Sequence, residues 1–494
     1  MDPASRARLV ELDKRHVWHP YTPMGRYRAE VEPLVVARAE GARLFDADGR
    51  SYLDGNSSWW VATLGHGHPR LVAALVRQAT SLGHVSLAGV THEPAVRLAE
   101  ELAAVAPGRL PHVFYSDDGS TAVEAALKMA LGVWRNEGRP ERRRVVALDG
   151  AFHGDTLGAA SLGGIDVFHR GWSGGVVECV RVPVPNAEGA NAGTANAGDG
   201  NAGDGNAGAA NAGTANAGTA NAGTANAGTA NAGTANAGGA GDAAGGYRAA
   251  FEAMRGLIRD GADTIAAVVV EPLLQGAAGM RVYPAAYLRE LARVCREHDV
   301  LLIADEVFTG YGRTGTMWAC EQAGIEPDIL CLAKGFSGGL LPMAATLASE
   351  RVFGAFLGEP QRALWHGHSF TGNPLGASVA REVLAIYREE RIVEQAQPKA
   401  RRIREAFARM GQLCGVAAWR ALGMMGCVEL ASGGGYLGRG GWCVYDEARA
   451  RGAYLRPLGD TVYVAPPINI ADADLEELLG IVEASLTAVL GQVP

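Results

Sequence analysis

Between about residues 95 and 350, short apolar runs alternate with stretches of helical periodicity, and this alternation narrows the fold more than any other feature. Runs such as IAAVVV, LLIA and ILCL are of the kind that fills a strand buried on both faces of a sheet. Strands that alternate with helices form a parallel sheet that is covered by helices. The sequence therefore predicts an α/β domain with a mostly parallel sheet. The last part of the chain reads as helix, strands and a closing helix, which predicts a smaller α+β domain.

Two of these runs end in a charged residue that a buried strand would not carry without a partner. LLIAD ends in Asp305, and ILCLAK ends in Lys334. Pyridoxal phosphate has an aldehyde, with which the lysine would form a Schiff base, and a pyridine nitrogen, which the aspartate would hold protonated. Either residue alone has a plainer interpretation, since an Asp after a strand often caps the next helix and a Lys is usually solvated. The pair, with its Gly-rich flanks, favours a cofactor site.

Other candidate site residues also follow predicted strands directly. They are Gly119, Phe152 and Glu271, which share this placement with Asp305 and Lys334. In open parallel sheets the ligand sites gather at the carboxyl ends of the strands. We therefore expect these side chains to belong to one site.

Two turns that contain Gly and Ser suit an anion. Gly119 and Ser120 stand at the start of a helix that follows the strand VFY. Free backbone N–H groups and the positive end of the helix dipole favour a phosphate there, and the Ser hydroxyl adds a donor. Ser120 could equally be an ordinary helix N-cap. Ser369, framed by glycines in GHSFTG before another helix, also suits phosphate oxygens.

Aromatic residues could wall the site. Phe152 could stack on a cofactor ring or pack in the core, and Tyr21, in the rigid segment HVWHPYTPMG, could line a pocket or plug the surface. Trp59 and Trp60 would point to opposite faces of an extended segment, one toward the core and one toward a site, unless both belong to the core. Asp155 could cap the turn after Phe152 or point into the pocket.

Arg456 lies between apolar runs in YLRPLGDTVYVAPP. An arginine in that setting needs an anion beside it. The residues leave open whether that anion is a structural carboxylate or the carboxylate of a substrate.

The amino-acid composition limits the classes of protein to which this chain can belong. The chain has 494 residues, 48% of them hydrophobic and 20% charged, as expected for a soluble enzyme of two or more domains. The net charge of −8 does not favour nucleic-acid binding. The N-terminus lacks the apolar core that a secretory signal would have, and no apolar run approaches the length of a membrane span. The seven scattered cysteines predict a reduced, cytoplasmic location. The two H-G-H triplets, at 66–68 and 366–368, have no evident third ligand, so no metal site is predicted.

A tract of Asn, Ala and Gly from about residue 186 to 246 repeats NAGTA and has almost no charge and no large apolar side chain. Such a tract cannot bury enough surface to offset the entropy of ordering it, so we interpret it as a disordered or loosely ordered surface insertion. The predicted division of the chain is 1–64 as the first part of a small domain, 65–351 as the large domain with this insertion, and 352–494 as the rest of the small domain.

The motifs IADEVFTGYGRTG, CLAKGFSGG and GHSFTGNP resemble those of the class III pyridoxal-phosphate-dependent aminotransferases of fold type I, and the similarity covers nearly the whole chain outside the Asn-Ala-Gly tract. VWHPYTPM, DGNSSWW and LRPLGD resemble the branch of that family that aminates 8-amino-7-oxononanoate in biotin synthesis. The resemblance implies a homodimer with shared active sites.

The resemblance also implies a role for each matching residue. Lys334 would carry the cofactor and shuttle the proton, Asp305 would pair with the pyridine nitrogen, and Arg456 would take the keto acid's carboxylate. The other cofactor contacts would be Gly119, Ser120, Phe152, Glu271 and Gln275, with His368 and Ser369 from the other subunit. The other substrate contacts would be Tyr21, Trp59, Trp60, Phe152, Asp155, Lys334 and Gly367.

Some positions depart from the family pattern. F-H-G-D stands where Y-H-G-D is usual, so Phe152 keeps the ring and lacks the hydroxyl, and Ser369 stands where Thr is common. GIDVFHRG and GHSFTGNP resemble the branch that uses lysine as amino donor, whereas the tryptophan pair resembles the branch that uses S-adenosylmethionine. We expect S-adenosylmethionine, with lysine as the alternative. Two other hypotheses are a class III transaminase for ω-amino acids or diamines, and a cofactor-binding protein without turnover.

Overall fold

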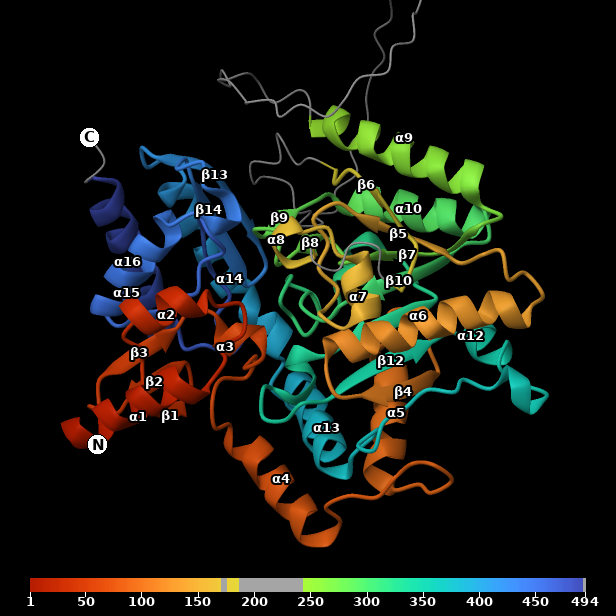
Figure 1. Cartoon of the computed structure of the whole chain (residues 1–494), viewed down its shortest axis with the longest axis horizontal. Helices are drawn as coiled ribbons and strands as arrows, with labels where there is room; N and C mark the ends of the chain where they lie inside the picture. The colour runs from red at the N-terminus through yellow and green to blue at the C-terminus, as the bar shows by residue number, and fades with distance from the viewer. Residues whose placement is uncertain (170–175, 186–242, 492–494) are drawn as a thin grey trace, which may run out of the picture.

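The computed structural model describes residues 1–169, 176–185 and 243–491 (Figure 1). The predicted Asn-Ala-Gly insertion lies outside these residues except for its last four positions. Those four positions begin helix α9 (Ala243–Gly261), which therefore starts earlier than the sequence suggested.

The centre of the fold is a seven-stranded sheet with the order β4-β12-β11-β10-β7-β5-β6. Neighbouring strands run parallel from β11 to β6, and β12 alone is antiparallel to both of its neighbours. The prediction of a mostly parallel α/β sheet is thus confirmed. The strands are β4 (His112–Ser116), β5 (Arg144–Leu148), β6 (Cys179–Val182), β7 (Ile265–Val270), β10 (Leu301–Asp305), β11 (Ile329–Leu332) and β12 (Ala344–Ala348).

Helices pack on both faces of this sheet, because successive strand residues point to opposite sides. Leu301 and Ile303 of β10 belong to the core cluster that contains Val123 of α6 (Gly119–Asn136). Leu302 belongs to the other cluster, with Leu288 of α10 (Ala285–Glu297). The other helices in contact with the sheet are α5 (Glu93–Val105), α7 (Leu157–Leu162), α9 and α12 (Glu350–Gly354).

The two ends of the chain meet in a second region, drawn red and blue at the left of Figure 1. Strand β3 of the N-terminal part pairs in parallel with β15 of the C-terminal part, so both parts share one four-stranded sheet. That sheet is β1 (Val36–Glu40), β2 (Arg43–Asp46), β3 (Ser51–Asp54) and β15 (Ala453–Tyr454). A three-stranded sheet, β13 (Val416–Leu422), β14 (Met425–Leu430) and β16 (Thr461–Val464), lies beside α14 (Ile392–Met410), α15 (Gly440–Ala450) and α16 (Asp472–Leu490). The exact limits of the two domains stay a prediction.

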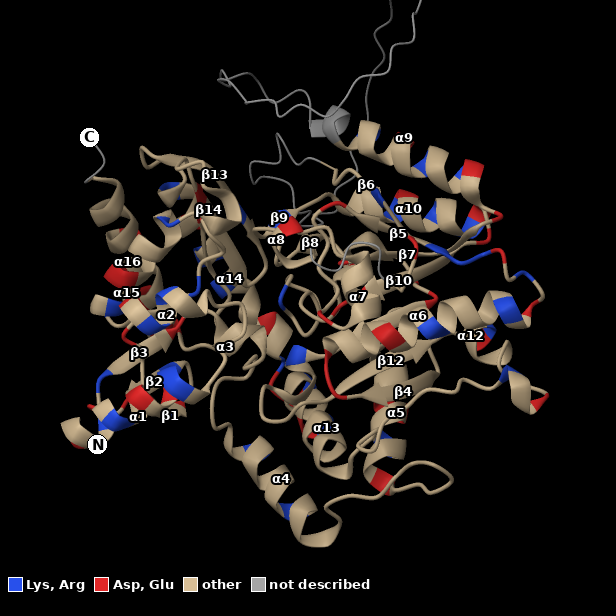
Figure 2. Cartoon of the chain, in the orientation of Figure 1, with Lys and Arg blue, Asp and Glu red and all other residues tan. Residues whose placement is uncertain are grey.

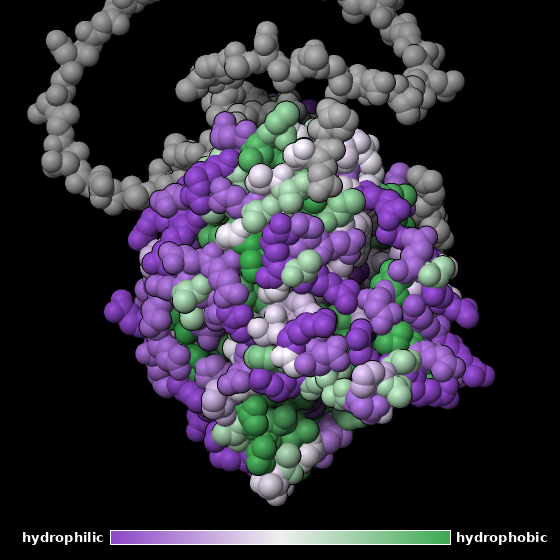
Figure 3. Space-filling model, turned by 90° about the vertical axis from the view of Figure 1, so that its left-hand side faces the viewer, coloured by the Kyte–Doolittle hydropathy of each residue, from purple (hydrophilic) through white to green (hydrophobic). Residues whose placement is uncertain are grey.

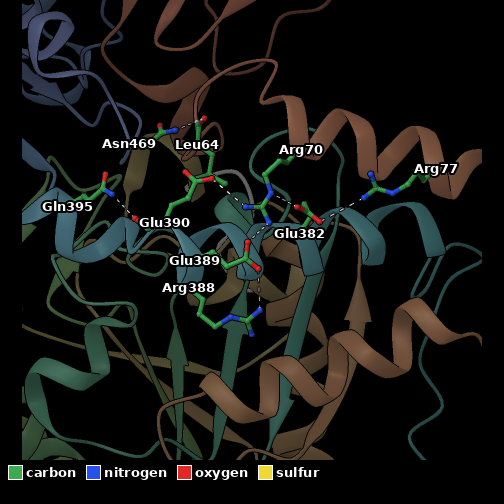
Figure 4. A network of polar contacts seen from close by, with 9 residues as sticks. All are labelled: Leu64, Arg70, Arg77, Glu382, Arg388, Glu389, Glu390, Gln395 and Asn469. Atoms are coloured by element: carbon green, nitrogen blue, oxygen red, sulfur yellow. Dashed lines mark hydrogen bonds and ion pairs between the residues drawn. The ribbon is translucent and has the colours of Figure 1, made fainter.

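Helix α4 (Pro69–Ser81) is joined to α13 (Pro374–Glu389) by a polar network, which Figure 4 shows. The Arg70 guanidinium lies 2.6 Å from Glu382 and 2.9 Å from Glu389, and Glu390 is 3.5 Å away. Ion pairs at the surface contribute little one at a time, but a guanidinium shared by several carboxylates fixes an orientation. The network therefore helps to fix α4 against α13.

The surface carries both signs of charge. Basic and acidic segments are interspersed over the helices in Figure 2, as expected from 45 Lys and Arg against 53 Asp and Glu. Among the described residues no helix has the length and apolar character needed to cross a membrane.

Candidate active site

A cavity of about 780 Å³ opens at the carboxyl ends of the central strands. Its walls come from the central sheet, the start of α6, the N-terminal segment and the C-terminal region. Of the predicted site residues it is lined by Tyr21, Trp59, Trp60, Gly119, Ser120, Phe152, Asp155, Glu271, Asp305, Lys334 and Arg456. The parallel sheet thus gathers residues that are more than 400 positions apart in the sequence.

Asp305 ends β10 and is almost completely buried. Its carboxylate lies 2.7 Å from Nδ1 of His153, and it accepts the backbone N–H of Val307 at 3.1 Å. Burial opposes protonation of His153, but the Asp305 carboxylate outweighs burial and raises the pKa of the imidazole. The plainer interpretation, that Asp305 caps a helix, does not hold, because the neighbouring Glu306 accepts the first N–H groups of α11 (Ala319–Ala323) instead.

Lys334 follows β11 and starts a short 3-10 helix, η2 (Lys334–Ser337). Its backbone has a φ of 47°, a conformation that is costly for a residue with a side chain and that often marks a functional position. Burial lowers the pKa of the amine, and the nearby carboxylates of Asp305 and Glu271 oppose that effect. The amine is therefore more readily neutral than a solvated lysine, as a nucleophile or base must be.

The start of α6 fits an anion. Asp118, not Ser120, is the N-cap, since its carboxylate accepts the N–H of Thr121 at 2.9 Å. The Ser120 Oγ accepts the N–H of Asp155 at 2.9 Å, which leaves the hydroxyl proton free to donate. A Cβ on Gly119 would lie 2.7 Å from a methyl of Val307, so only glycine fits at that point of the cavity wall.

Gly154 holds the F-H-G-D loop against the start of α6. Its φ is +129°, and a Cβ there would lie 2.7 Å from the Ser120 Cα and closer still to the Ser120 Oγ. We expect Gly154→Ala to push the loop away, to weaken binding of a phosphate at Ser120, and to destabilise the fold by at least about 2 kcal/mol. Gly138→Ala is the matched control, because Gly138 also has a positive φ, +79°, but has open space around the Cβ position. Thermal denaturation measures the stability of both variants relative to the wild type. An equal loss in Gly154→Ala and Gly138→Ala would contradict the prediction.

Glu271 and Gln275 differ in position. The Glu271 carboxylate, in the cavity wall, accepts the N–H of Phe152 at 3.2 Å and the N–H of Gly276 at 2.9 Å. The Gln275 amide lies behind the wall, where it donates to the Asp149 carbonyl at 3.1 Å, and its Oε1 is buried without a partner among the described residues. Gln275 therefore supports the loop and does not line the cavity of this structure.

The tryptophan pair is not extended. Residues Ser57 to Trp60 have φ between 44° and 73°, so the chain makes a left-handed turn there. Trp60 is buried and donates from Nε1 to the Tyr463 hydroxyl at 3.1 Å, whereas Trp59 is half-buried. Both tryptophans line the cavity, and Trp60 belongs to a core cluster as well, so the expected division of one residue to the core and one to the site is not present.

The lining residues that lie outside the central sheet, here called the outer part of the cavity, include aromatic rings and two charged groups, Asp155 and Arg456. The Arg456 Cζ lies 4.3 Å above the Trp59 ring, and Trp59 contacts Tyr21 with ring centroids 5.4 Å apart. The Tyr21 hydroxyl donates to the Asp155 carboxylate in a short hydrogen bond. Within the described part of the chain no carboxylate forms an ion pair with Arg456, which leaves the guanidinium available to an anion in the cavity.

Gly367, His368 and Ser369 do not line this cavity. The His368 Nδ1 lies 3.4 Å from the Asp117 carboxylate, close to the start of α6. Their assignment to the cofactor and substrate of a second subunit stays a prediction.

With this geometry in place, the chain can be compared with known proteins. The sequence model described as aminotransferase class-III matches residues 26–199 and 224–486. The chain belongs to the class-III aminotransferases.

Curated relatives and solved structures agree with that family. The chain is 39% identical to the adenosylmethionine-8-amino-7-oxononanoate aminotransferase of Nitratidesulfovibrio vulgaris, over 98% of this chain and 83% of the relative. It is 37% identical to the protein of the same name from Geobacter sulfurreducens, over 98% of both chains. The crystal structure of the Methanocaldococcus jannaschii protein of that name superposes with a TM-score of 0.82, at 31% identity, over 98% of this chain and 99% of that one. The structure of an amine transaminase from an uncultivated Pseudomonas species, solved in its PLP-bound form, gives a TM-score of 0.81. The two chains are 29% identical over 96% of this chain and 98% of that one. The fold is that of the class-III transaminases, fold type I.

Sequence reasoning missed three residues of this class-III site. His153 holds Asp305, and its place between Phe152 and Asp155 in F-H-G-D was the available signal. Phe168 and Tyr436 line the cavity although they follow no predicted strand. Tyr436 is the only aromatic residue in the Gly-rich stretch SGGGYLGRGG, which could have drawn attention to it.

Glu271 gives this aminotransferase a pH dependence. Burial raises the pKa of its carboxyl to about 7, with His153 opposing and Asp305 adding to the effect. In the unfolded chain this carboxyl has its ordinary pKa of 4.5. The contribution of Glu271 to the free energy of unfolding is therefore greatest below pH 4.5 and is lost as the pH rises through about 7. We expect the cofactor-free protein to lose on the order of 3 kcal/mol between pH 4.5 and pH 8 relative to Glu271→Gln. If the free energies of unfolding of the wild type and of Glu271→Gln changed by the same amount with pH, this prediction would be wrong.

Proposed function

We propose that this protein is the aminotransferase that converts 8-amino-7-oxononanoate to 7,8-diaminononanoate in biotin biosynthesis, with pyridoxal phosphate as cofactor. The observation that carries the proposal is that one cavity is lined both by the Lys334 amine and the Asp305 carboxylate and by the Arg456 guanidinium, which forms no ion pair among the described residues. The names of the curated relatives support the substrate. A long keto acid with a terminal carboxylate matches a cavity that is reactive at one end and cationic at the other.

The residues present fit the cofactor. Gly119 leaves room at the start of α6 that any Cβ would fill, and Ser120 has a free hydroxyl proton, so these two residues would hold the phosphate. Phe152 would lie against the ring, with Glu271 and, behind it, Gln275 at the ring edge. When bound, the cofactor withdraws electrons from the carbon that carries the amine and so makes its C–H bond acidic.

Lys334 would act twice. Its amine would hold the cofactor through the aldehyde, and its Nζ would serve as the base that takes the proton from the α-carbon of the donor. Burial supports this role because the lowered pKa of Lys334 increases the fraction of neutral amine. The same Nζ would deliver a proton to the keto acid's carbon when the amine is transferred to it.

Asp305 would keep a negative charge beside the pyridine nitrogen and so hold that nitrogen protonated. The His153 Nδ1 lies 2.7 Å from it and orients the carboxylate. The pair is buried, so water does not weaken the interaction.

The substrate would be held by the outer part of the cavity. Arg456 binds the carboxylate of the keto acid, and Trp59 places the guanidinium. The Tyr21 hydroxyl and the Asp155 carboxylate form a hydrogen-bonded wall, which Trp60 and Phe152 complete with apolar surface.

The protein would act as a homodimer in which Gly367, His368 and Ser369 complete the partner's site. The loop that carries them exposes Trp365 and Phe370 by 79% and 57%, and α4 exposes Val72 and Val76 by 40% and 57%. Hydrophobic side chains gather at the lower end of the face in Figure 3, the end at which Figure 1 draws α4. A second copy of this chain is the occupant that would cover both groups. The free state of every cysteine within the described residues supports a reduced, cytoplasmic location.

S-adenosylmethionine is the proposed amino donor, as the names of the relatives suggest, and lysine is the alternative. The test mixes the holoenzyme with each donor separately, and then adds 8-amino-7-oxononanoate. We expect S-adenosylmethionine to remove the cofactor's absorption band and the keto acid to restore it. If lysine removes the band and S-adenosylmethionine does not, the proposed donor is wrong, but the proposed conversion of 8-amino-7-oxononanoate is unaffected.

A second candidate is a class-III transaminase for ω-amino acids or diamines, which the similarity to the amine transaminase structure favours. The same experiment separates the two. If 8-amino-7-oxononanoate fails to restore the band and a simple ω-oxo acid succeeds, the second candidate replaces the first.

A further inference from the structure

The stretch that carries Tyr436 is fixed to the turn that follows Arg456. The carbonyl of Gly435 accepts the N–H of Asp460 at 3.1 Å, and the Asp460 carboxylate accepts the N–H of Gly440 at 3.3 Å. A Cβ on Gly459 would collide with that Gly435 carbonyl, so the two backbones are in close contact. The position of Tyr436 is therefore tied to that of Arg456, four residues before Asp460.

Phe168, on α8 (Asp166–His169), supports the Tyr436 ring from the side of the central sheet. The two rings meet edge to face, with centroids 4.8 Å apart and planes at 84°. Phe168 also contacts Tyr21 at 4.9 Å and Phe152 at 5.8 Å. The Tyr436 ring is thus held from both regions of the molecule, with its side chain in the cavity wall.

The Tyr436 hydroxyl is available as a donor. Among the described residues it has no hydrogen-bond partner, whereas the Tyr21 hydroxyl is engaged by Asp155. Burial raises the pKa of Tyr436 to about 12, with Arg456 opposing, so the hydroxyl keeps its proton at physiological pH. The Arg456 guanidinium also lines the cavity, and among the described residues it forms no ion pair with a carboxylate.

We infer that Tyr436 is a second recognition residue for the substrate carboxylate, donating its hydroxyl to the anion that Arg456 binds. The inference deepens the proposed function and rests on it only for the identity of the substrate. A guanidinium attracts any anion, and a hydroxyl held at a fixed place beside it selects a carboxylate whose chain reaches that place. Tyr436 would therefore help to measure chain length as well as charge.

The test is the binding of heptanoate and of heptanamide to the holoenzyme, measured by calorimetry, in the wild type and in Tyr436→Phe. Both ligands have the same chain, and neither has an amine or a ketone, so neither reacts. We expect Tyr436→Phe to weaken heptanoate binding roughly 10-fold, the effect of one hydrogen bond to a charged group, and to change heptanamide less than about 2-fold. Tyr445→Phe is the matched control, since Tyr445 lies on α15 after the same stretch and does not line the cavity.

Kinetics give an independent readout. Tyr436→Phe should raise KM for 8-amino-7-oxononanoate with little change in kcat, because the hydroxyl would contact the carboxylate of the substrate and not the reacting carbon. Unchanged heptanoate binding in Tyr436→Phe, or an equal loss for heptanoate and heptanamide, would overturn the inference. The two proposals can fail separately. If Tyr436→Phe weakens heptanoate binding as expected but the wild type does not convert 8-amino-7-oxononanoate, the proposed function is wrong and Tyr436 is still a carboxylate-binding residue.

Discussion

Lys334→Ala is expected to lower kcat for transamination by about 10⁴-fold or more, because it removes both the covalent partner of the cofactor and the base that moves the proton. The residue lies at the sheet end of the cavity, 5.2 Å from the Trp60 ring, and no other lysine lines that cavity. Thus no neighbouring amine among the described residues can replace it. Single-turnover kinetics with a saturating donor would measure the loss.

A control separates this effect from a general loss of charge. Lys14→Ala changes another of the four lysines, on α1 (Pro3–His16), away from the cavity. It should keep full activity. A Lys334→Ala protein with activity within tenfold of the wild type would exclude the proposed role of Lys334.

Asp305→Asn is the second large effect, with an expected loss of about 10³-fold in kcat, the scale seen when a fixed charge stabilisation is removed from a buried site. Asparagine keeps the size of the side chain and loses the negative charge. His153, which lies 2.7 Å from the carboxylate, would then lose the partner that raises its pKa. The variant should therefore show a changed pH profile as well as a lower rate.

Asp299→Asn is the control for this second variant. Asp299, like Asp305, has basic side chains beside it, at 2.7 Å from Arg139 and 2.6 Å from Arg351, but it does not line the cavity. It should leave kcat unchanged. Wild-type kcat in Asp305→Asn, with the cofactor bound, would show that the pyridine nitrogen does not depend on this carboxylate.

Much of this site could be predicted because it is encoded by the ends of strands. In a parallel sheet, all carboxyl ends lie on one edge, so Asp305 and Lys334 had to be neighbours once β10 and β11 were recognised as apolar runs. The helix start at Gly119 was predictable for a similar reason, because it follows β4 directly. Local pattern and a general rule of sheet geometry were sufficient for these residues.

Other residues could not be placed in this way. The directions of Trp59 and Trp60 were considered for the case of an extended segment, but the structure has a left-handed turn from Ser57 to Trp60. The place of Gln275 at the ring edge stays a prediction, and no local pattern indicated that its amide would donate to the Asp149 carbonyl behind the cavity wall. Positive φ values and the direction of a long side chain depend on tertiary contacts that no local pattern reports.

By itself, the sequence determined the mostly parallel sheet, the strand-end residues and the family, because apolar periodicity and motif spacing are local properties of the chain. Only the tertiary structure decided that His153 supports Asp305, and that Phe168 meets Tyr436 across the cavity. Those contacts join residues 152 and 268 positions apart, and they depend on how the C-terminal region packs against the sheet and on how the loops fold over it. Such packing is set by the summed burial of many side chains, which is a property of the whole fold.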